Sequence, residues 1–173
     1  MRRASDTRLE QTRGFHLDRN RSVGYLLRES SRAMMRDLQE RIERHDVTLG
    51  QYFIMRELWD ADGMTQRELS ERIGLFENST NAAIDAMEAR GLVERRRSTA
   101  DRRKIHLHLS LRGRRLRDVL LGYAVEINEI AVDGFSSDEI EMLRDLLHRV
   151  RDNVRAHRER GPGAGPRRRA ARR

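Results

Sequence analysis

A group of small and polar side chains gives the clearest chemical signal in the sequence. Five such residues stand at the start of a predicted helix, Glu77–Arg90: Asn78, Ser79, Thr80, Asn81 and Ala82. Asparagine forms paired hydrogen bonds with an adenine edge, and a small alanine permits close approach or contact with a thymine methyl group. These residues are therefore candidate base-reading positions on a helix that enters the major groove of duplex DNA.

A second group of charged side chains flanks the short polar link between two predicted strands, Leu92–Arg97 and Lys104–Ser110. Its candidate DNA-contacting residues are Arg95, Arg97, Asp101, Arg102 and Arg103. An arginine at the tip of a hairpin can enter a narrow minor groove, where the negative potential is enhanced. We expect Asp101 to brace Arg103 through a charge-assisted hydrogen bond.

The elements around these two groups follow a recognisable order. A short predicted helix, Gln66–Ile73, is preceded by a brief strand at Met64-Thr65, and Thr65 with Glu68 fits the capping-box pattern. Gly74 permits a sharp turn before the candidate base-reading helix, and Gly91 is placed as its left-handed C-cap. Two helices followed by a hairpin predict a winged helix-turn-helix, which presents its second helix to the major groove.

Long helices flank this unit on both sides. Predicted helices cover Asn20–Arg44, Leu49–Ala61 (N-capped by Thr48), Arg114–Val132 and Ser137–His157. In the last two, apolar residues are spaced alternately by three and four, which is typical of seams that bind partner helices. The expected fold is mainly α with a small β hairpin (α+β), and a second copy of the chain is expected to complete its core.

The resulting organisation has five parts. They are a flexible N-terminal arm (1–19), an N-terminal dimerisation helix (20–47), a winged DNA-binding domain (48–113), C-terminal dimerisation helices (114–157) and a disordered basic tail (158–173).

Composition excludes several classes of protein. The chain has no cysteine, which excludes disulfides and thiolate metal sites, and no apolar run long enough to span a bilayer. No secretory signal follows the N-terminus, so a cytoplasmic location is expected. The net charge of +8 lies in the two ends of the chain, with +3 in residues 1–21 and +6 in residues 158–173. Residues 22–157 therefore sum to −1, and local charge must carry the DNA-binding argument.

The sequence resembles the MarR family of bacterial transcriptional regulators. The motifs that carry the resemblance are Val47-Thr48-Leu49-Gly50-Gln51, Thr65-Gln66-Arg67-Glu68-Leu69, Gly91-Leu92-Val93-Glu94-Arg95, Asp101-Arg102-Arg103 and Leu109-Ser110-Leu111-Arg112-Gly113. The resemblance implies a homodimer on a pseudo-palindromic site in double-stranded DNA, and a repressor that a small aromatic ligand releases. Family members often carry arginine where this chain has Ala82, which implies an unusual base readout.

The resemblance also implies an effector cavity between the dimerisation helices and the DNA-binding lobe. Candidate lining residues are Tyr25, Arg28, Arg32, Met35, Tyr52, Met55 and Trp59, although ordinary core and dimer packing is favoured for any single one of the aromatic and methionine side chains. Aromatic acids and aromatic acyl-coenzyme A thioesters are both expected effectors, the latter because arginines lie near Arg28.

Two other classes of function are an enzyme, with or without a metal, and an architectural DNA-binding protein. His106 and His108 lie on one strand face and could bind a metal with Asp101, but the set lacks a cysteine and Asp101 is not a convincing third ligand, so neither a metal nor a cofactor is expected. No nucleophile motif or phosphate-binding glycine loop indicates an enzyme. A non-specific architectural DNA-binding protein that grips phosphates with its arginine-rich ends remains the alternative.

Overall fold

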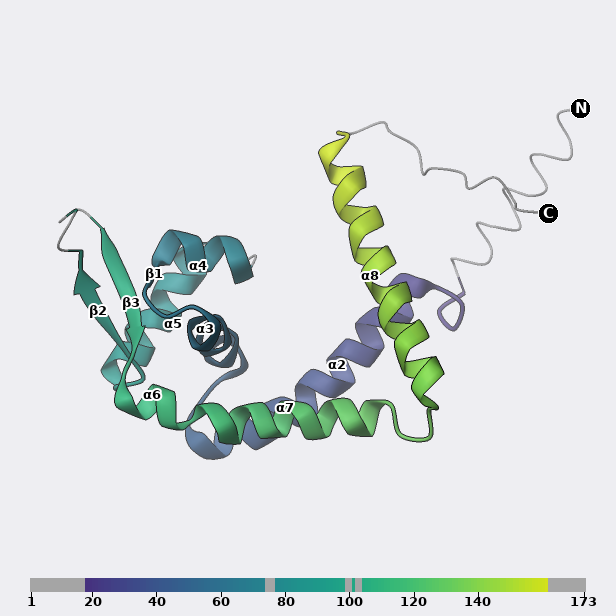
Figure 1. The fold of residues 1–173 in the computed structure, drawn as a ribbon, viewed down its shortest axis with the longest axis horizontal. Helices are drawn as coiled ribbons and strands as arrows, with labels where there is room; N and C mark the ends of the chain where they lie inside the picture. The colour runs from purple at the N-terminus through teal and green to yellow at the C-terminus, as the bar shows by residue number, and fades with distance from the viewer. Residues whose placement is uncertain (1–17, 74–76, 99–100, 102–103, 162–173) are drawn as a thin grey trace, which may run out of the picture. The chain divides into compact units, whose positions relative to one another are not determined.

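Two helices, α2 (Val23–Ile42) and α7 (Arg117–Ala131), cross in the computed structural model, which describes residues 18–73, 77–98, 101 and 104–161 (Figure 1). Arg41 of α2 forms ion pairs with Asp37 on its own helix and with Glu126 of α7. The hydrogen bond that Arg41 donates to Asp37 is the main cause that raises the pKa of the Arg41 guanidinium above its ordinary value. The pair with Glu126 joins α2 to α7 beside a core of apolar side chains.

The turn from α2 to the next helix is short and specific. A 3₁₀ turn, η1 (Glu43–His45), leads to Asp46, which adopts the left-handed conformation at φ 57°. The His45 Nε2 atom lies 3.0 Å from the Tyr123 hydroxyl of α7. Helix α3 (Leu49–Asp60) then begins at a capping box in which Thr48 and Gln51 exchange hydrogen bonds, which confirms the predicted N-cap.

The helix-turn-helix consists of α4 (Gln66–Ile73) and α5 (Glu77–Ala89). The predicted capping box at α4 is confirmed, because Glu68 accepts a hydrogen bond from the Thr65 amide at 2.7 Å. The same amide and the Thr65 hydroxyl lower the pKa of Glu68. Gly91 has φ +65°, a conformation that side chains disfavour, and it ends α5 as the sequence predicted.

A three-stranded antiparallel sheet forms the wing. Strands β2 (Val93–Arg97) and β3 (Ile105–Leu109) pair with Val93 opposite Leu109 and Arg97 opposite Ile105. The brief strand β1 (Met64–Thr65) pairs with the other edge of β3, so the order is β1-β3-β2. The predicted hairpin and the predicted brief strand therefore belong to one sheet.

The structure contains two helices where the sequence predicted one over Arg114–Val132, and the first of them begins before Arg114. A separate short helix, α6 (Leu111–Arg115), precedes α7, and the two meet at Leu116. Ser110 caps α6 by accepting a hydrogen bond from the Gly113 amide at 3.0 Å. Gly113, which the sequence analysis treated as the end of the domain, thus lies inside a helix.

The core of the first unit (residues 1–131) joins α2, α3, α4, α5, the sheet and α7. Its buried apolar side chains are Leu38, Ile42, Val47, Tyr52, Ile54, Met55, Leu58, Met64, Leu69, Ile84, Met87, Leu92, Val93, Leu107, Leu109, Leu120 and Ile127. The wing and the helix-turn-helix therefore share one core with the end of α2.

A second unit begins at Val132 and contains α8 (Ser137–Glu159). Ser136 and Glu139 form a capping box at its start, and the Ser136 amide and hydroxyl lower the pKa of Glu139. None of the side chains in α8 is buried in the single chain. Among the described residues, no helix is both long and apolar enough to cross a membrane.

Candidate nucleic-acid interface

Helix α5 has one face in the core and one in solvent. Thr80, Ile84 and Met87 are buried at helical spacing, with exposed fractions of 0% each. The opposite face exposes small and acidic side chains: Ala82, Asp85, Ala86 and Ala89. The spacing of the buried residues thus fixes which face of α5 a ligand can reach.

The five predicted base-reading residues do not share one environment. Ala82 is exposed and Asn81 is half-buried, so both can be reached from solvent. Thr80 points into the core, because it occupies the first position of the buried stripe, and it does not belong to the exposed face. Asn78 and Ser79 belong to α5, but their side chains lie outside the described part of the structure.

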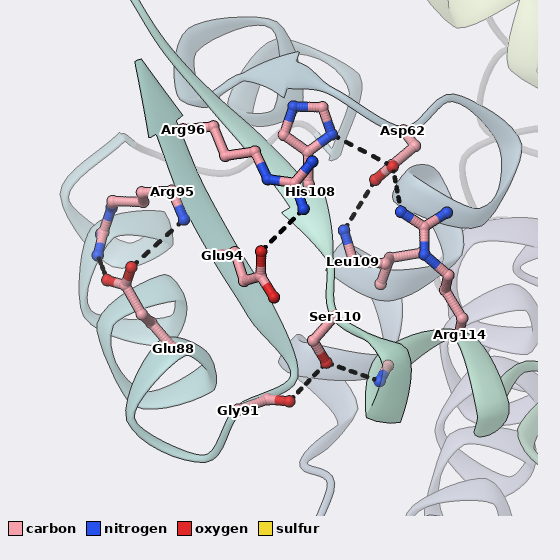
Figure 2. A network of polar contacts seen from close by, with 11 residues as sticks. Asp62, Glu88, Gly91, Glu94, Arg95, Arg96, His108, Leu109, Ser110 and Arg114 are labelled. Atoms are coloured by element: carbon pink, nitrogen blue, oxygen red, sulfur yellow. Dashed lines mark hydrogen bonds and ion pairs between the residues drawn. The ribbon is translucent and has the colours of Figure 1, made fainter.

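Arg95 of β2 holds the exposed face of α5 to the wing. Its guanidinium forms ion pairs with Asp85 and with Glu88, and the Glu88 contact is visible in Figure 2. The Arg95 amide also donates to Glu88 at 3.3 Å. Partial burial lowers the pKa of Arg95, but the hydrogen bonds that it donates to Asp85 and Glu88 outweigh burial and raise that pKa. The sequence analysis placed Arg95 on DNA and missed this intramolecular role.

The rest of the hairpin is more exposed. Arg97 is exposed at the end of β2, and Arg96 pairs with Glu94 at 2.9 Å (Figure 2). The Ser98 amide donates to the Lys104 carbonyl at 2.9 Å, and the Lys104 amide donates to the Asp101 carbonyl at 2.9 Å. These bonds close the hairpin tip. Arg102 and Arg103, and with them the predicted brace from Asp101 to Arg103, lie outside the described residues.

Asp62, which the sequence analysis did not single out, connects the turn after α3 to strand β3 and helix α6. Its carboxylate accepts hydrogen bonds from the Leu109 amide at 2.8 Å and from the Arg114 guanidinium at 2.9 Å (Figure 2). The Nδ1 atom of His108 lies 3.3 Å from the same carboxylate. Burial alone raises the pKa of Asp62, but the Leu109, His108 and Arg114 contacts together lower it below the ordinary value.

The two strand histidines both face the turn after α3. The His106 Nδ1 atom lies 2.7 Å from the Gly63 carbonyl oxygen, and His108 contacts Asp62. Each ring thus has a structural partner at this turn. Within the described ranges, no group of three or more histidine, aspartate or glutamate side chains is arranged to hold a metal ion.

The predicted effector-binding residues divide between two places. Tyr52 and Met55 are buried in the core, and the Trp59 indole donates to the Gly113 carbonyl at 3.1 Å. Tyr25 and Arg28 lie near the start of α2, where the Arg28 guanidinium stacks over the Tyr25 ring at 5.1 Å.

Two further members of this set lie on α2, where Arg32 is exposed and Met35 is half-buried. About 15 Å of helix axis separates Tyr25 from Met35, at a rise of about 1.5 Å per residue. The set therefore does not converge on one cavity within the described single chain.

Comparison with known proteins gives a consistent result. Residues 47–105 match the MarR family. An uncharacterised HTH-type transcriptional regulator from Bacillus subtilis, YybA, is 28% identical over 109 residues, which cover 63% of this chain and 73% of that protein.

Solved structures share the fold. A MarR transcriptional regulator from Methanosarcina mazei has a TM-score of 0.71 and 24% identity, with 76% of this chain and 95% of that chain covered. A mutant MarR from E. coli, complexed with operator DNA, has a TM-score of 0.68 and 21% identity, with coverage of 74% and 92%.

Proposed function

Because residues 47–105 form a MarR family domain and the chain is a DNA-binding transcriptional regulator of that family, we propose that it acts as a homodimeric repressor. The proteins that it matches are regulators, and this chain is a regulator rather than an enzyme. In the proposed complex, two copies of α5 enter successive major grooves of a pseudo-palindromic operator, and the wings contact the flanking minor grooves. We propose that this function is carried out in the cytoplasm.

The observation that carries the DNA-binding part is the two-faced structure of α5. Its buried stripe anchors it in the domain, while Asn81 and Ala82 at its start remain accessible. In the DNA complex of E. coli MarR, which shares this fold, the protein holds operator DNA. We propose that Asn81 reads a base and that Arg97, Arg102 and Arg103 contact the groove beside it.

The observation that supports a dimer is the uncovered apolar surface of α8. Its exposed apolar side chains include Met142, Leu143, Leu146, Leu147 and Val154. Exposed apolar surface of this extent is typical of an interface, because a monomer in water gains by covering it. The start of α2 adds Val23, Leu26 and Leu27, which are also exposed.

Release by a small aromatic acid, or by its coenzyme A thioester, completes the proposal. Tyr25 offers an aromatic face, and Arg28 beside it offers a guanidinium for a carboxylate or phosphate. Tyr25 and Arg28 lie far from Met35 along the axis of α2. The proposed pocket therefore requires side chains from the second copy. Such an effector would act by binding more tightly to a dimer whose recognition helices have the wrong spacing.

Selection from random-sequence duplexes followed by footprinting tests the proposal. The parent should protect two half-sites about one helical turn apart, and benzoate-type acids or their thioesters should reduce the protection. Asn81→Ala should relax the preference at one base pair in each half-site, while an exposed α8 variant, His148→Ala, should not. A protein that selects no sequence, and that loses all DNA binding when residues 162–173 are deleted, would instead be an architectural DNA-binding protein.

A further inference from the structure

The C-terminal end of α5 is bound at three consecutive carbonyl groups by one short segment. The Arg90 carbonyl accepts a hydrogen bond from the Arg112 guanidinium at 2.8 Å. The Gly91 carbonyl accepts one from the Ser110 hydroxyl at 2.5 Å, as Figure 2 shows, and the Leu92 carbonyl accepts one from the Ser110 amide at 3.0 Å. The end of α5 is therefore fixed to the start of α6, which leads directly into α7.

Arg90 connects the same end of α5 to a second place. Its guanidinium donates to the Asp46 carbonyl at 2.8 Å. Asp46 is the only residue other than glycine with a positive φ in the described ranges, and it forms the turn from α2 into α3. One side chain therefore connects the recognition helix to the turn at the end of α2, while its own backbone carbonyl is held by Arg112.

The two connections lead to the two helices of the first unit that cross. Helices α2 and α7 are joined by the ion pair between Arg41 and Glu126, and His45, in the turn after α2, contacts Tyr123 of α7. Asp46 follows α2 after the short turn η1, and Arg112 lies in α6 directly before α7, so we expect a change in the angle between α2 and α7 to move Asp46 relative to Arg112. Arg90 is hydrogen-bonded at both points, so it is placed to pass such a change on to the direction of α5.

We infer that Arg90 is a positioning residue for operator recognition, which fixes the direction of α5 relative to α2 and α7 and so sets the spacing of the two recognition helices. The inference rests on the proposed homodimer. Arg90 is exposed. An exposed hydrogen bond contributes little to the free energy of unfolding, so Arg90→Ala should fold normally and change mainly the geometry.

The experiment compares binding to operators of different spacing. The probe is the duplex that the parent selects from random sequence, together with versions that have one base pair added or removed between half-sites. The parent should prefer its own spacing, and Arg90→Ala should reduce this preference by about fivefold or more, because coupling between sites is typically of that size. Arg90→Lys retains one donor and should recover part of the preference.

The matched control is Arg56→Ala, which removes an exposed positive charge whose guanidinium donates within its own helix, to the Tyr52 hydroxyl. It should leave the spacing preference unchanged. A second readout uses the absence of cysteine from the chain. A spin label at Ala86→Cys gives one distance between the two copies of α5 in the dimer. That distance distribution should broaden or shift in the Arg90→Ala background and match the parent in the Arg56→Ala background.

The outcomes separate the inference from its alternatives. If Arg90→Ala weakens all spacings equally and lowers the salt dependence by about one counterion, Arg90 contacts a phosphate and the inference is wrong. An unchanged preference together with an unchanged distance distribution also overturns it. If the parent is a monomer or selects no duplex, the proposed function itself fails, and the inference fails with it.

Discussion

The Asp62 carboxylate meets three kinds of group near the wing: a backbone amide, a guanidinium and an imidazole. Each partner stabilises the ionised form, and the pKa of Asp62 is lowered as a result. A carboxylate whose folded-state pKa is depressed stabilises the fold above its unfolded-state pKa. That stabilisation is lost as the pH falls through the folded-state value.

Asp62→Asn should therefore destabilise the fold in a pH-dependent way. At neutral pH we expect the free energy of unfolding to fall by about 1–3 kcal/mol, because the charged hydrogen bonds to Arg114 and His108 are lost. The difference from the parent should narrow as the pH falls through the acid range, where the parent carboxylate is protonated too. Urea denaturation at several pH values measures this. Asp118→Asn is the control, because that side chain is 90% exposed. A pH-independent difference would contradict the assignment.

Arg95→Ala should weaken DNA binding without removing a DNA contact. The substitution leaves the carboxylates of Asp85 and Glu88 without their ion-pair partner on the helix that we propose enters the major groove. Like charges brought together at an interface are costly, so we expect roughly a tenfold loss of affinity at low salt. Fluorescence anisotropy with labelled duplex measures the loss.

A charge-matched variant tests the cause of that loss. Adding Asp85→Asn and Glu88→Gln to Arg95→Ala removes the uncompensated charge and should restore most of the affinity. If the triple variant binds as weakly as Arg95→Ala alone, then Arg95 contacts DNA directly, as the sequence analysis expected.

At this scale the sequence predicted residue types better than residue partners. The polar start of α5 and the arginines of the hairpin were recognisable from their types and order. The pairing of Arg95 with Asp85 and Glu88 was not, because it depends on the packing of a helix against a strand. The three-residue spacing of the two acids on α5 was the available signal. The burial of Thr80 likewise depends on which face of α5 meets the core.

Among the elements, the caps were predictable because each is a local contact between residues three apart. Thr48 and Thr65 both cap the helices that the sequence assigned to them, and Ser136 caps α8 by the same kind of contact. Helix α6 was missed because Gly113 resembles a helix end. Its role is set by a distant segment: a Cβ atom on Gly113 would overlap the Leu92 carbonyl oxygen, so the site accepts only glycine. A close contact between two backbone segments that are distant in the chain cannot be predicted from the local sequence.

Gly113→Ala should therefore destabilise the junction between α5 and α6. The added methyl group forces the Leu92 backbone to move, and overpacking of this kind typically costs about 1–3 kcal/mol. Thermal or urea denaturation measures the change in the free energy of unfolding. Gly122→Ala is the matched control, because nothing lies within contact distance of its Cβ position in α7. That control should gain up to about 1 kcal/mol from better helix propensity. Equal effects at both positions would refute the close approach.

For the whole molecule, the apolar seam in α8 was visible in the sequence, but its partner was not. The alternating spacing of Ile140, Leu143, Leu147, Val150 and Val154 predicts a buried stripe, yet no side chain of α8 is buried in the single chain. A pattern of spacing shows that a helix face needs a partner, and it does not identify the partner. The proposed second copy satisfies both observations, because it covers the stripe without any further element from this chain.

Leu147→Glu should separate the dimer and, as a consequence, weaken operator binding. A carboxylate on the apolar face of α8 would be buried against the second copy without a counter-charge, which is strongly unfavourable. We expect the dimer dissociation constant to rise by about 100-fold or more. Analytical ultracentrifugation should then report 20.3 kDa where the parent reports twice that mass. His148→Glu places the same charge on the adjacent, exposed position, away from the stripe, and should remain dimeric.

Since two linked half-sites bind far more tightly than one, Leu147→Glu should also lose most of its operator affinity while each domain stays folded. A Leu147→Glu protein that remains dimeric, or a parent that is already monomeric, would place the dimer interface elsewhere or remove it.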